Sequence, residues 1–205
     1  MNRTIISKVP IGKSGDWEVK KINVNKEEAD WHNLRCSVKR EERGREIEVG
    51  EYTQLLRNNS TIMSDTPAEL RDFDDFIVKA QGHVLITGLG LGLVTKAVCD
   101  KENVKSVTVI EQSEDVFNLV GNHITSEKLT IIIADAYTFD PYPILKKLGI
   151  KKFDYMWHDI WDDICGDNIK MFVRMKDHYQ PYMKAGKRQG FWAERECINQ
   201  GMDGW

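Results

Sequence analysis

The stretch HVLITGLGLGLVTKAVCD, residues 83–100, decides the fold of this chain. Its first part, 83–88, is a continuous apolar run of the kind that a buried strand of a parallel sheet requires. Gly88, Gly90 and Gly92 follow, and the apolar positions then recur at helical spacing. Glycines at a strand-to-helix turn let the backbone bend sharply and approach a ligand closely. The stretch therefore predicts a strand, a binding turn and a helix.

The chain after this stretch repeats the alternation of strands and helices. Further strands are predicted at 105–111, 129–135, 153–159 and 190–196, and helical segments separate them. A helix over 67–81 precedes the first strand, and the capping-box pattern Thr66-Pro67-Ala68-Glu69 marks its start. Strands joined by helices form a parallel sheet with helices on both faces. The predicted fold class is α/β, a doubly wound, Rossmann-like, mostly parallel sheet.

The N-terminal part of the chain has a different pattern. From 17 to 63, short runs alternate between apolar and polar residues and are punctuated by Gly44, Gly50 and Asn58-Asn59. We therefore expect two domains, a β-hairpin module over 1–63 and a Rossmann-like domain over 64–205. The second domain looks short at its C-terminal end, so its fifth strand is expected at an edge. A second copy of the chain, in a homo-oligomer, or the N-terminal module could cover that edge.

Composition narrows the classes of function. The 205 residues are 30% charged and 41% hydrophobic, which is ordinary for a globular protein. The net charge of −3 argues against a generally basic surface, so a nucleic acid is not the expected partner. No apolar run approaches a membrane span of about 20 residues, and the N-terminus lacks a secretory signal. Four scattered cysteines and five scattered histidines predict reduced thiols, no metal site and a cytoplasmic location.

An acidic residue ends the second predicted strand. Glu111 follows Gly92 by nineteen residues, where an acid accepts hydrogen bonds from the ribose hydroxyls of an adenosine. The dinucleotide pattern asks for a third small residue at position 93, and Leu93 stands there instead. The turn and the acid together predict an adenosine-containing ligand other than NAD.

Five segments carry a resemblance to a known family. They are IMSDTPAELRDF (62–73), VLITGLGLG (84–92), VTVIEQ (107–112), IIIADAYTF (131–139) and FDYMWHD (153–159). Over about residues 52–194, the chain resembles the class I S-adenosylmethionine (SAM)-dependent methyltransferases, and within them the spermidine synthase-like branch. The first of the five segments is the one most particular to that branch.

The resemblance implies SAM as the cofactor and assigns residues to it. Gly88, Gly90 and Gly92 would admit its methionine portion, Glu111 its ribose, and Asp135 with Ala136 its adenine. Two departures separate the chain from true aminopropyltransferases. Leu91 takes the place of an acid in the glycine turn, and Ile160-Trp161-Asp162-Asp163 replaces a small, polar, proline-containing loop.

The end of the fourth strand is the predicted reacting end of the site. Asp159 or His158 is placed to take a proton from an attacking nucleophile. Trp157, Trp161 and Asp162 are candidates for substrate binding, because aromatic faces and carboxylates stabilise a cation. For Trp157 and His158, packing in the core is an equally good interpretation.

These observations lead to one expected function and two alternatives. The expected function is a SAM-dependent methyltransferase that acts on a small or medium polar acceptor by in-line methyl transfer. A spermidine synthase-like aminopropyltransferase that uses decarboxylated SAM is the first alternative. The second is a non-catalytic protein that binds SAM or a nucleoside.

Overall fold

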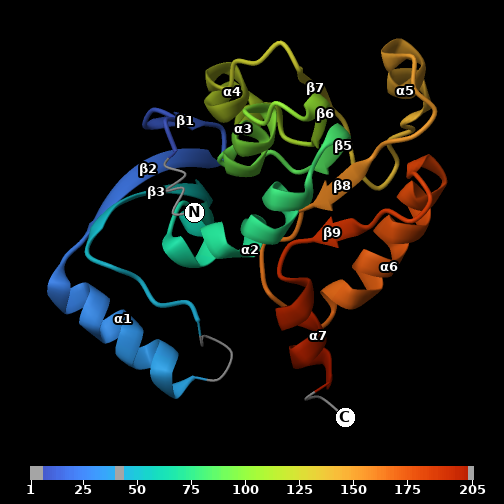
Figure 1. Ribbon diagram of the computed structural model, residues 1–205. Helices are drawn as coiled ribbons and strands as arrows, with labels where there is room; N and C mark the ends of the chain where they lie inside the picture. The colour runs from blue at the N-terminus through green and yellow to red at the C-terminus, as the bar shows by residue number, and fades with distance from the viewer. Residues whose placement is uncertain (1–6, 40–43, 203–205) are drawn as a thin grey trace.

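A computed structural model describes residues 7–39 and 44–202, which form two separate sheets (Figure 1). The larger sheet has five parallel strands in the order β7-β6-β5-β8-β9. Its strands are β5 (Gly82–Thr87), β6 (Val104–Glu111), β7 (Leu129–Ile133), β8 (Tyr155–His158) and β9 (Gln189–Phe191). The predicted doubly wound fold class is therefore confirmed.

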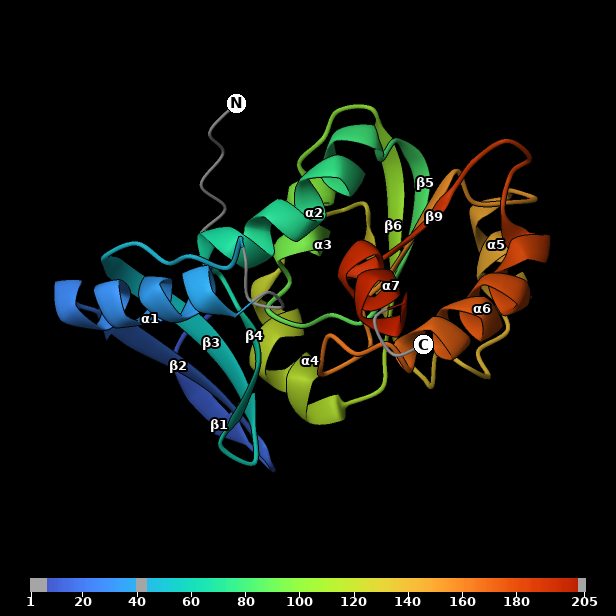
Figure 2. The same ribbon diagram turned by 90° about the horizontal axis from the view of Figure 1, so that it is seen from below.

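Helices cover both faces of the parallel sheet. On one face, Figures 1 and 2 show α2 (Pro67–Lys79), α3 (Leu93–Cys99) and α4 (Glu114–Val120). On the other lie α5 (Tyr142–Leu148) and α6 (Asn168–Tyr179). Short 3-10 helices at Gly121–His123 and Gln180–Tyr182 follow α4 and α6. Two covered faces explain why β5 and β6 are buried along most of their length.

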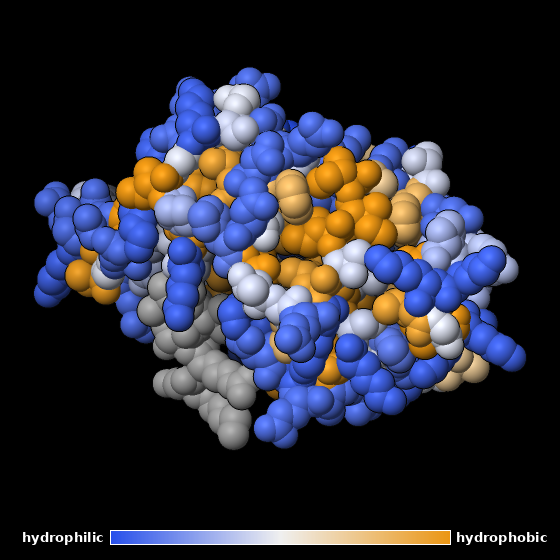
Figure 3. All heavy atoms as spheres, turned by 90° about the horizontal axis from the view of Figure 1, so that it is seen from above, coloured by the Kyte–Doolittle hydropathy of each residue, from blue (hydrophilic) through white to orange (hydrophobic). Residues whose placement is uncertain are grey.

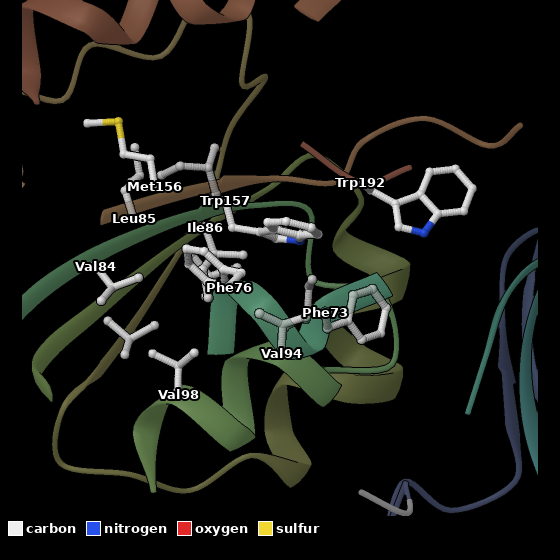
Figure 4. Close-up of a cluster of buried hydrophobic side chains, with 14 of the residues drawn as sticks. Phe73, Phe76, Val84, Leu85, Ile86, Val94, Val98, Met156, Trp157 and Trp192 are labelled. Atoms are coloured by element: carbon white, nitrogen blue, oxygen red, sulfur yellow. The ribbon is translucent and has the colours of Figure 1, made fainter. Parts of the chain in front are cut away.

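The core between α2, α3 and the sheet is built on aromatic contacts (Figure 4). The ring of Trp157 on β8 lies 5.1 Å from that of Phe76 and 6.2 Å from that of Phe73, measured between centroids. Val94 and Val98 of α3 belong to the same buried cluster. Edge-to-face and tilted ring pairs of this kind add to the stabilisation that burial provides.

The smaller sheet is antiparallel and packs beside α4. Its strands, in spatial order, are β1 (Gly12–Ser14), β2 (Trp17–Val24), β3 (Gly50–Arg57) and β4 (Ser60–Ser64). The Ser14 hydroxyl donates a hydrogen bond of 2.6 Å to the Asp115 carboxylate of α4. The sheet is thereby held against the parallel-sheet domain. The division of the chain into two domains at residue 63 stays a prediction.

The hairpin interpretation of the N-terminal module is wrong for one segment, because Lys26–Val38 forms helix α1. The Asn25 side chain accepts from the Glu28 amide at 3.0 Å, and the Glu28 carboxylate accepts from the Asn25 amide at 2.9 Å. This reciprocal capping box starts the helix. Within α1 only Ala29 and Cys36 are buried. Its apolar residues therefore show no clear helical period, and the alternation of apolar and polar residues over 17–63 predicts hairpins there instead.

Two other boundaries differ from the prediction. Thr66 makes no side-chain capping bond, and the carboxylate of Glu69 accepts from the amide of Ser64 at 2.8 Å instead. The fifth strand ends at Phe191, since Ala193 has a positive φ of 50° and α7 (Glu194–Met202) begins directly after it. The predicted strand over 190–196 is therefore mostly a turn and a helix. Strand β9 does lie at an edge of the sheet, and the homo-oligomer stays a prediction.

Apolar side chains are also exposed on part of the surface. On the face seen in Figure 3, apolar patches are bordered by hydrophilic residues. Within residues 7–39 and 44–202, no helix has the length and apolar character that crossing a bilayer requires.

Candidate functional site

A cavity of about 280 Å³ lies where β5, β6, β7 and β8 end. Carboxyl ends of parallel strands meet at one edge of the sheet, and ligands of such folds bind there. The parallel-sheet domain contributes four groups of lining residues, which are Gly88 and Gly90, the segment 110–113 with Val116, the segment 134–137 and the segment 159–162. The cavity therefore gathers the ends of four strands that are far apart in the sequence.

The glycine turn needs glycine for its backbone and for its close contacts. Gly88, Gly90 and Gly92 have positive φ values of 88°, 52° and 72°. A Cβ atom on Gly90 would lie 2.5 Å from the sulfur of Met63. Of the three predicted glycines, Gly88 and Gly90 line the cavity. Gly92 is the N-cap residue of α3 and packs against Ile124.

Glu111 is held rigidly at the end of β6. One of its carboxylate oxygens accepts from the Leu89 amide and the other from the Ser113 amide, both at 2.8 Å. The residue is 8% exposed and lines the cavity. Burial raises the pKa of Glu111. Each oxygen of a carboxylate can accept more than one hydrogen bond, so Glu111 keeps acceptor capacity for a ligand.

The segment after β7 forms the neighbouring wall of the cavity. Asp135 accepts from the Tyr137 amide at 2.8 Å, which fixes the local turn. The Ala136 carbonyl accepts from the hydroxyl of Tyr179 at 2.7 Å, so α6 supports this wall from behind. Asp135 and Ala136 both line the cavity beside Tyr137. The structure thus brings the predicted ribose and adenine residues to one side of the same cavity.

Asp159 is the first residue after β8 and lines the cavity beside the glycine turn. Its amide donates to the Thr87 carbonyl at 2.9 Å. Burial raises the pKa of Asp159 well above its usual range, and the nearby carboxylates of Glu69, Asp72 and Glu111 add to the effect. A carboxyl of raised pKa is suited to accept and hold a proton. Trp161 and Asp162 line the same end of the cavity.

His158 and Trp157 are not among the residues that line the cavity. His158 is fully buried, its Nδ1 lies 3.0 Å from the Thr87 hydroxyl, and its Nε2 lies 3.0 Å from the Gln189 side-chain oxygen. Burial lowers its pKa to about 4. Because an amide oxygen can only accept, Nε2 carries the proton and the ring is neutral. This placement gives His158 no access to a substrate in the cavity.

Trp157 points to the opposite face of the sheet from His158, because successive side chains of a strand alternate. It is 4% exposed and packs on α2. Trp157 therefore packs in the core, and the substrate-binding role predicted for it stays a prediction.

The antiparallel sheet supplies lining residues that the sequence did not point to. They are Trp17, Leu55, Arg57, Ile62 and Met63. Arg57 forms an ion pair with Asp162, and its guanidinium lies 5.3 Å from the centroid of the Trp17 ring. The sulfur of Met63 accepts from the Leu91 amide at 3.1 Å. No local pattern marks these residues, since strand pairing between distant segments brings them to the site.

The lining is strongly acidic. Among the described residues that line the cavity, four have carboxyl groups and one, Arg57, has a cationic side chain. Among residues 7–39 and 44–202, no group of histidine, cysteine and acidic side chains could hold a metal ion.

Comparison with known families gives one match. The model of the ribosomal RNA adenine dimethylase family matches residues 67–182, which is more than half of the chain. The matched region runs from the start of α2 to the 3-10 helix after α6, so it includes the glycine turn and all three acidic strand ends. No curated protein sequence is significantly similar to the chain.

Several solved structures are similar to the chain at low sequence identity. Spermidine synthase from Thermotoga maritima is 12% identical, with 72% of this chain and 56% of that chain covered and a TM-score of 0.48. The N-terminal domain of EvdMO1 with SAH bound is 20% identical, with 42% and 34% covered and a TM-score of 0.34. The chain thus spans about a third to just over half the length of these structures.

Proposed function

The chain belongs to the ribosomal RNA adenine dimethylase family, and from this premise we propose that it transfers the methyl group of SAM to an amino nitrogen. Membership confirms the predicted SAM-dependent methyltransferase superfamily, with SAM as the cofactor. It also conflicts with the expectation that nucleic acid is not a partner, because the family is named for an RNA acceptor. The acceptor of this chain is the subject of the proposal.

The residues of the cavity fit SAM by their chemistry. Glu111 keeps acceptor capacity for two ribose hydroxyls, because each carboxylate oxygen accepts one amide hydrogen bond and can accept another. Asp135 stands at the end of the next strand, within reach of an adenine amino group, and Gly88 and Gly90 leave room beside them for the rest of the molecule. SAM supplies an electrophilic methyl group on a positively charged sulfur.

Asp159 is the observation that carries the proposed chemistry. Asp159 lines the cavity where the loop after β8 begins, next to the glycine turn. When a neutral amine attacks, an N–CH₃ bond forms and the S–CH₃ bond breaks, and the new ammonium group must lose a proton. In its ionised form the Asp159 carboxylate would take that proton, and its raised pKa makes it a stronger base than an ordinary aspartate.

We infer that the acceptor is a small or medium amine. The antiparallel sheet closes this end of the cavity with Trp17, Leu55 and Arg57. The Arg57–Asp162 ion pair joins that sheet to the loop after β8, across the reacting end. An acidic site favours an acceptor that carries positive charge over a polyanion.

An adenine amino group in RNA is the second candidate, and family membership favours it. Trp161 and Tyr137 line the cavity, and aromatic faces stack with unpaired bases. A base extruded from its helix into the cavity would present its amino group to Asp159.

A transfer assay with isotopically labelled SAM tests these proposals. The full chain would be offered a panel of small amines, polyamines and ribosomal RNA in parallel. Methyl transfer to an amine, abolished by Asp159→Asn, is the expected result. Transfer to RNA alone would select the second candidate. Binding of SAH without transfer to any acceptor would show that the chain is a non-catalytic binding protein.

A further inference from the structure

Arg57 ends strand β3 and is held over the cavity by two contacts. Strand register places it opposite Trp17 of β2, and its guanidinium lies over that indole ring at 5.3 Å from the centroid. Its other contact is the ion pair with Asp162, in the loop after β8. The side chains of Arg57 and Asp162 are 43% and 39% exposed, so solvent reaches this pair. An exposed ion pair of this kind is weak and easily exchanged.

The charges around the cavity leave one group of SAM without a partner. Its methionine portion ends in a carboxylate, and four acidic side chains already line the cavity, from Glu111, Asp135, Asp159 and Asp162, although burial raises the pKa of Glu111 and Asp159. Like charges at short range repel one another. Arg57 is the single cationic side chain among the described lining residues that could balance that carboxylate.

The amides of the glycine turn are largely engaged within the protein. The Leu89 amide donates to Glu111 and the Leu91 amide to the sulfur of Met63. The amides of Gly88 and Gly92 donate to the carbonyls of Ile110 and Leu89. Four of the five amides from 88 to 92 are therefore occupied, so a carboxylate cannot rely on this turn for its hydrogen bonds.

We propose that Arg57 binds the methionine carboxylate of SAM and exchanges its contact with Asp162 for it. The guanidinium offers two parallel N–H groups that match a carboxylate, and the Trp17 ring keeps it in place during the exchange. Asp162 is then released to face the acceptor amine. The inference rests on the proposed function, since it assigns a residue of the antiparallel sheet to recognition of the same cofactor.

The exchange makes Arg57 the residue that distinguishes SAM from decarboxylated SAM. Two probes that have an uncharged thioether sulfur in place of the sulfonium isolate the carboxylate. They are SAH and its decarboxylated form, S-adenosyl-3-thiopropylamine, which differs only by the missing carboxylate. Calorimetry on the full chain would measure the affinity of both probes for the unmodified protein and for Arg57→Met. We expect a loss of at least about tenfold for SAH and little change for the decarboxylated probe.

Three further variants sharpen the test. Arg188→Met removes an arginine from the surface ion pair with Glu194 and should leave both affinities unchanged. Arg57→Lys keeps the positive charge, and it should retain part of the preference for SAH if Arg57→Met does not fold. Asp162→Asn removes the competing carboxylate, so SAH affinity should stay the same or rise.

If Arg57→Met loses affinity for both probes equally, the inference is overturned. It is also overturned if Asp162→Asn loses as much affinity for SAH as Arg57→Met does. Either result would mean that the ion pair only holds the two segments together. If the unmodified protein binds neither probe, the proposed function fails and the inference falls with it.

Discussion

The backbone carbonyl oxygen of Asp159 lies 1.8 Å from the point that a Cβ atom on Gly88 would occupy. The end of β8 therefore packs directly on the glycine turn after β5, and a side chain at position 88 has no room. This contact joins the predicted cofactor turn to the predicted reacting end of the cavity. The same contact also contributes to the stability of the fold.

Replacing Gly88 tests that contact. Gly88→Ala should lower the free energy of unfolding by about 2 kcal/mol or more, because the residue has a φ of 88° and its Cβ would clash with fixed backbone. Gly149→Ala is the matched control, since Gly149 has a φ of 66° and no atom within 4 Å of its Cβ position. Urea denaturation measures both. If the two variants lose the same free energy of unfolding, the clash with Asp159 adds no destabilisation beyond that of the positive φ.

Glu111 should matter for both ligand affinity and stability. In Glu111→Gln, one of the two amides that now bond to the carboxylate faces an NH₂ group instead of an oxygen. We expect SAH affinity to fall at least about tenfold and the ligand-free protein to lose about 1–3 kcal/mol. Calorimetry and urea denaturation separate the two effects. Unchanged affinity in a folded variant would remove Glu111 from the binding site.

Asp159 should serve the transfer step more than cofactor binding. Asp159→Asn keeps the shape of the side chain and removes its basicity, so turnover should fall about 10²–10⁴-fold while SAH affinity changes little. Asp163→Asn is the control, because Asp163 is an exposed acid of the same loop and does not line the cavity. Steady-state assays on the acceptor found in the transfer screen measure this. Undiminished turnover in Asp159→Asn would place the reacting end elsewhere.

Glu69 should make the stability of the protein depend on pH. Burial raises the pKa of Glu69 from 4.5 to about 7, against the opposing effects of the Ser64 amide and Arg45. Between these two values the folded state holds a proton that the unfolded state has lost, so stability should fall as pH rises through this window. Glu69→Gln, which cannot ionise, should reduce the difference in stability between pH 5 and pH 8 by about 1–3 kcal/mol.

Urea midpoints at the two pH values would check the Glu69 prediction. Lys79 and Asp75 provide a control, because they form an exposed ion pair on the same helix. Asp75→Asn should leave the pH dependence as it is in the unmodified protein. If Glu69→Gln and the unmodified protein keep the same pH dependence, Glu69 ionises normally in the fold.

Much of the cofactor side of the cavity could be predicted from local patterns. Parallel strands joined by helices bring their carboxyl ends to one edge, so residues that follow each strand must meet there. Gly88, Glu111, Asp135 and Asp159 each follow or end a recognisable apolar strand, and all four line the cavity. Their roles in binding and catalysis stay predictions until ligands are tested.

Local patterns failed where burial or long-range pairing governs the outcome. Helix α1 was missed because its apolar residues are mostly exposed and carry no clear period. Trp157 and His158 stand beside Asp159 in the sequence, but they are the last residues of a strand that is covered on both faces. Their side chains therefore enter the two cores, one on each side of the sheet.

The acceptor end of the cavity is a property of the folded chain. Trp17 and Arg57 are forty residues apart in the sequence, and antiparallel pairing sets them opposite each other. Packing of their sheet on α4 then brings both over the ends of the parallel strands, where Arg57 meets Asp162. Periodicity and spacing report only on residues that are close together in the sequence. Which strand pairs with which, and which faces then close a cavity, depends on contacts between segments that no local pattern contains.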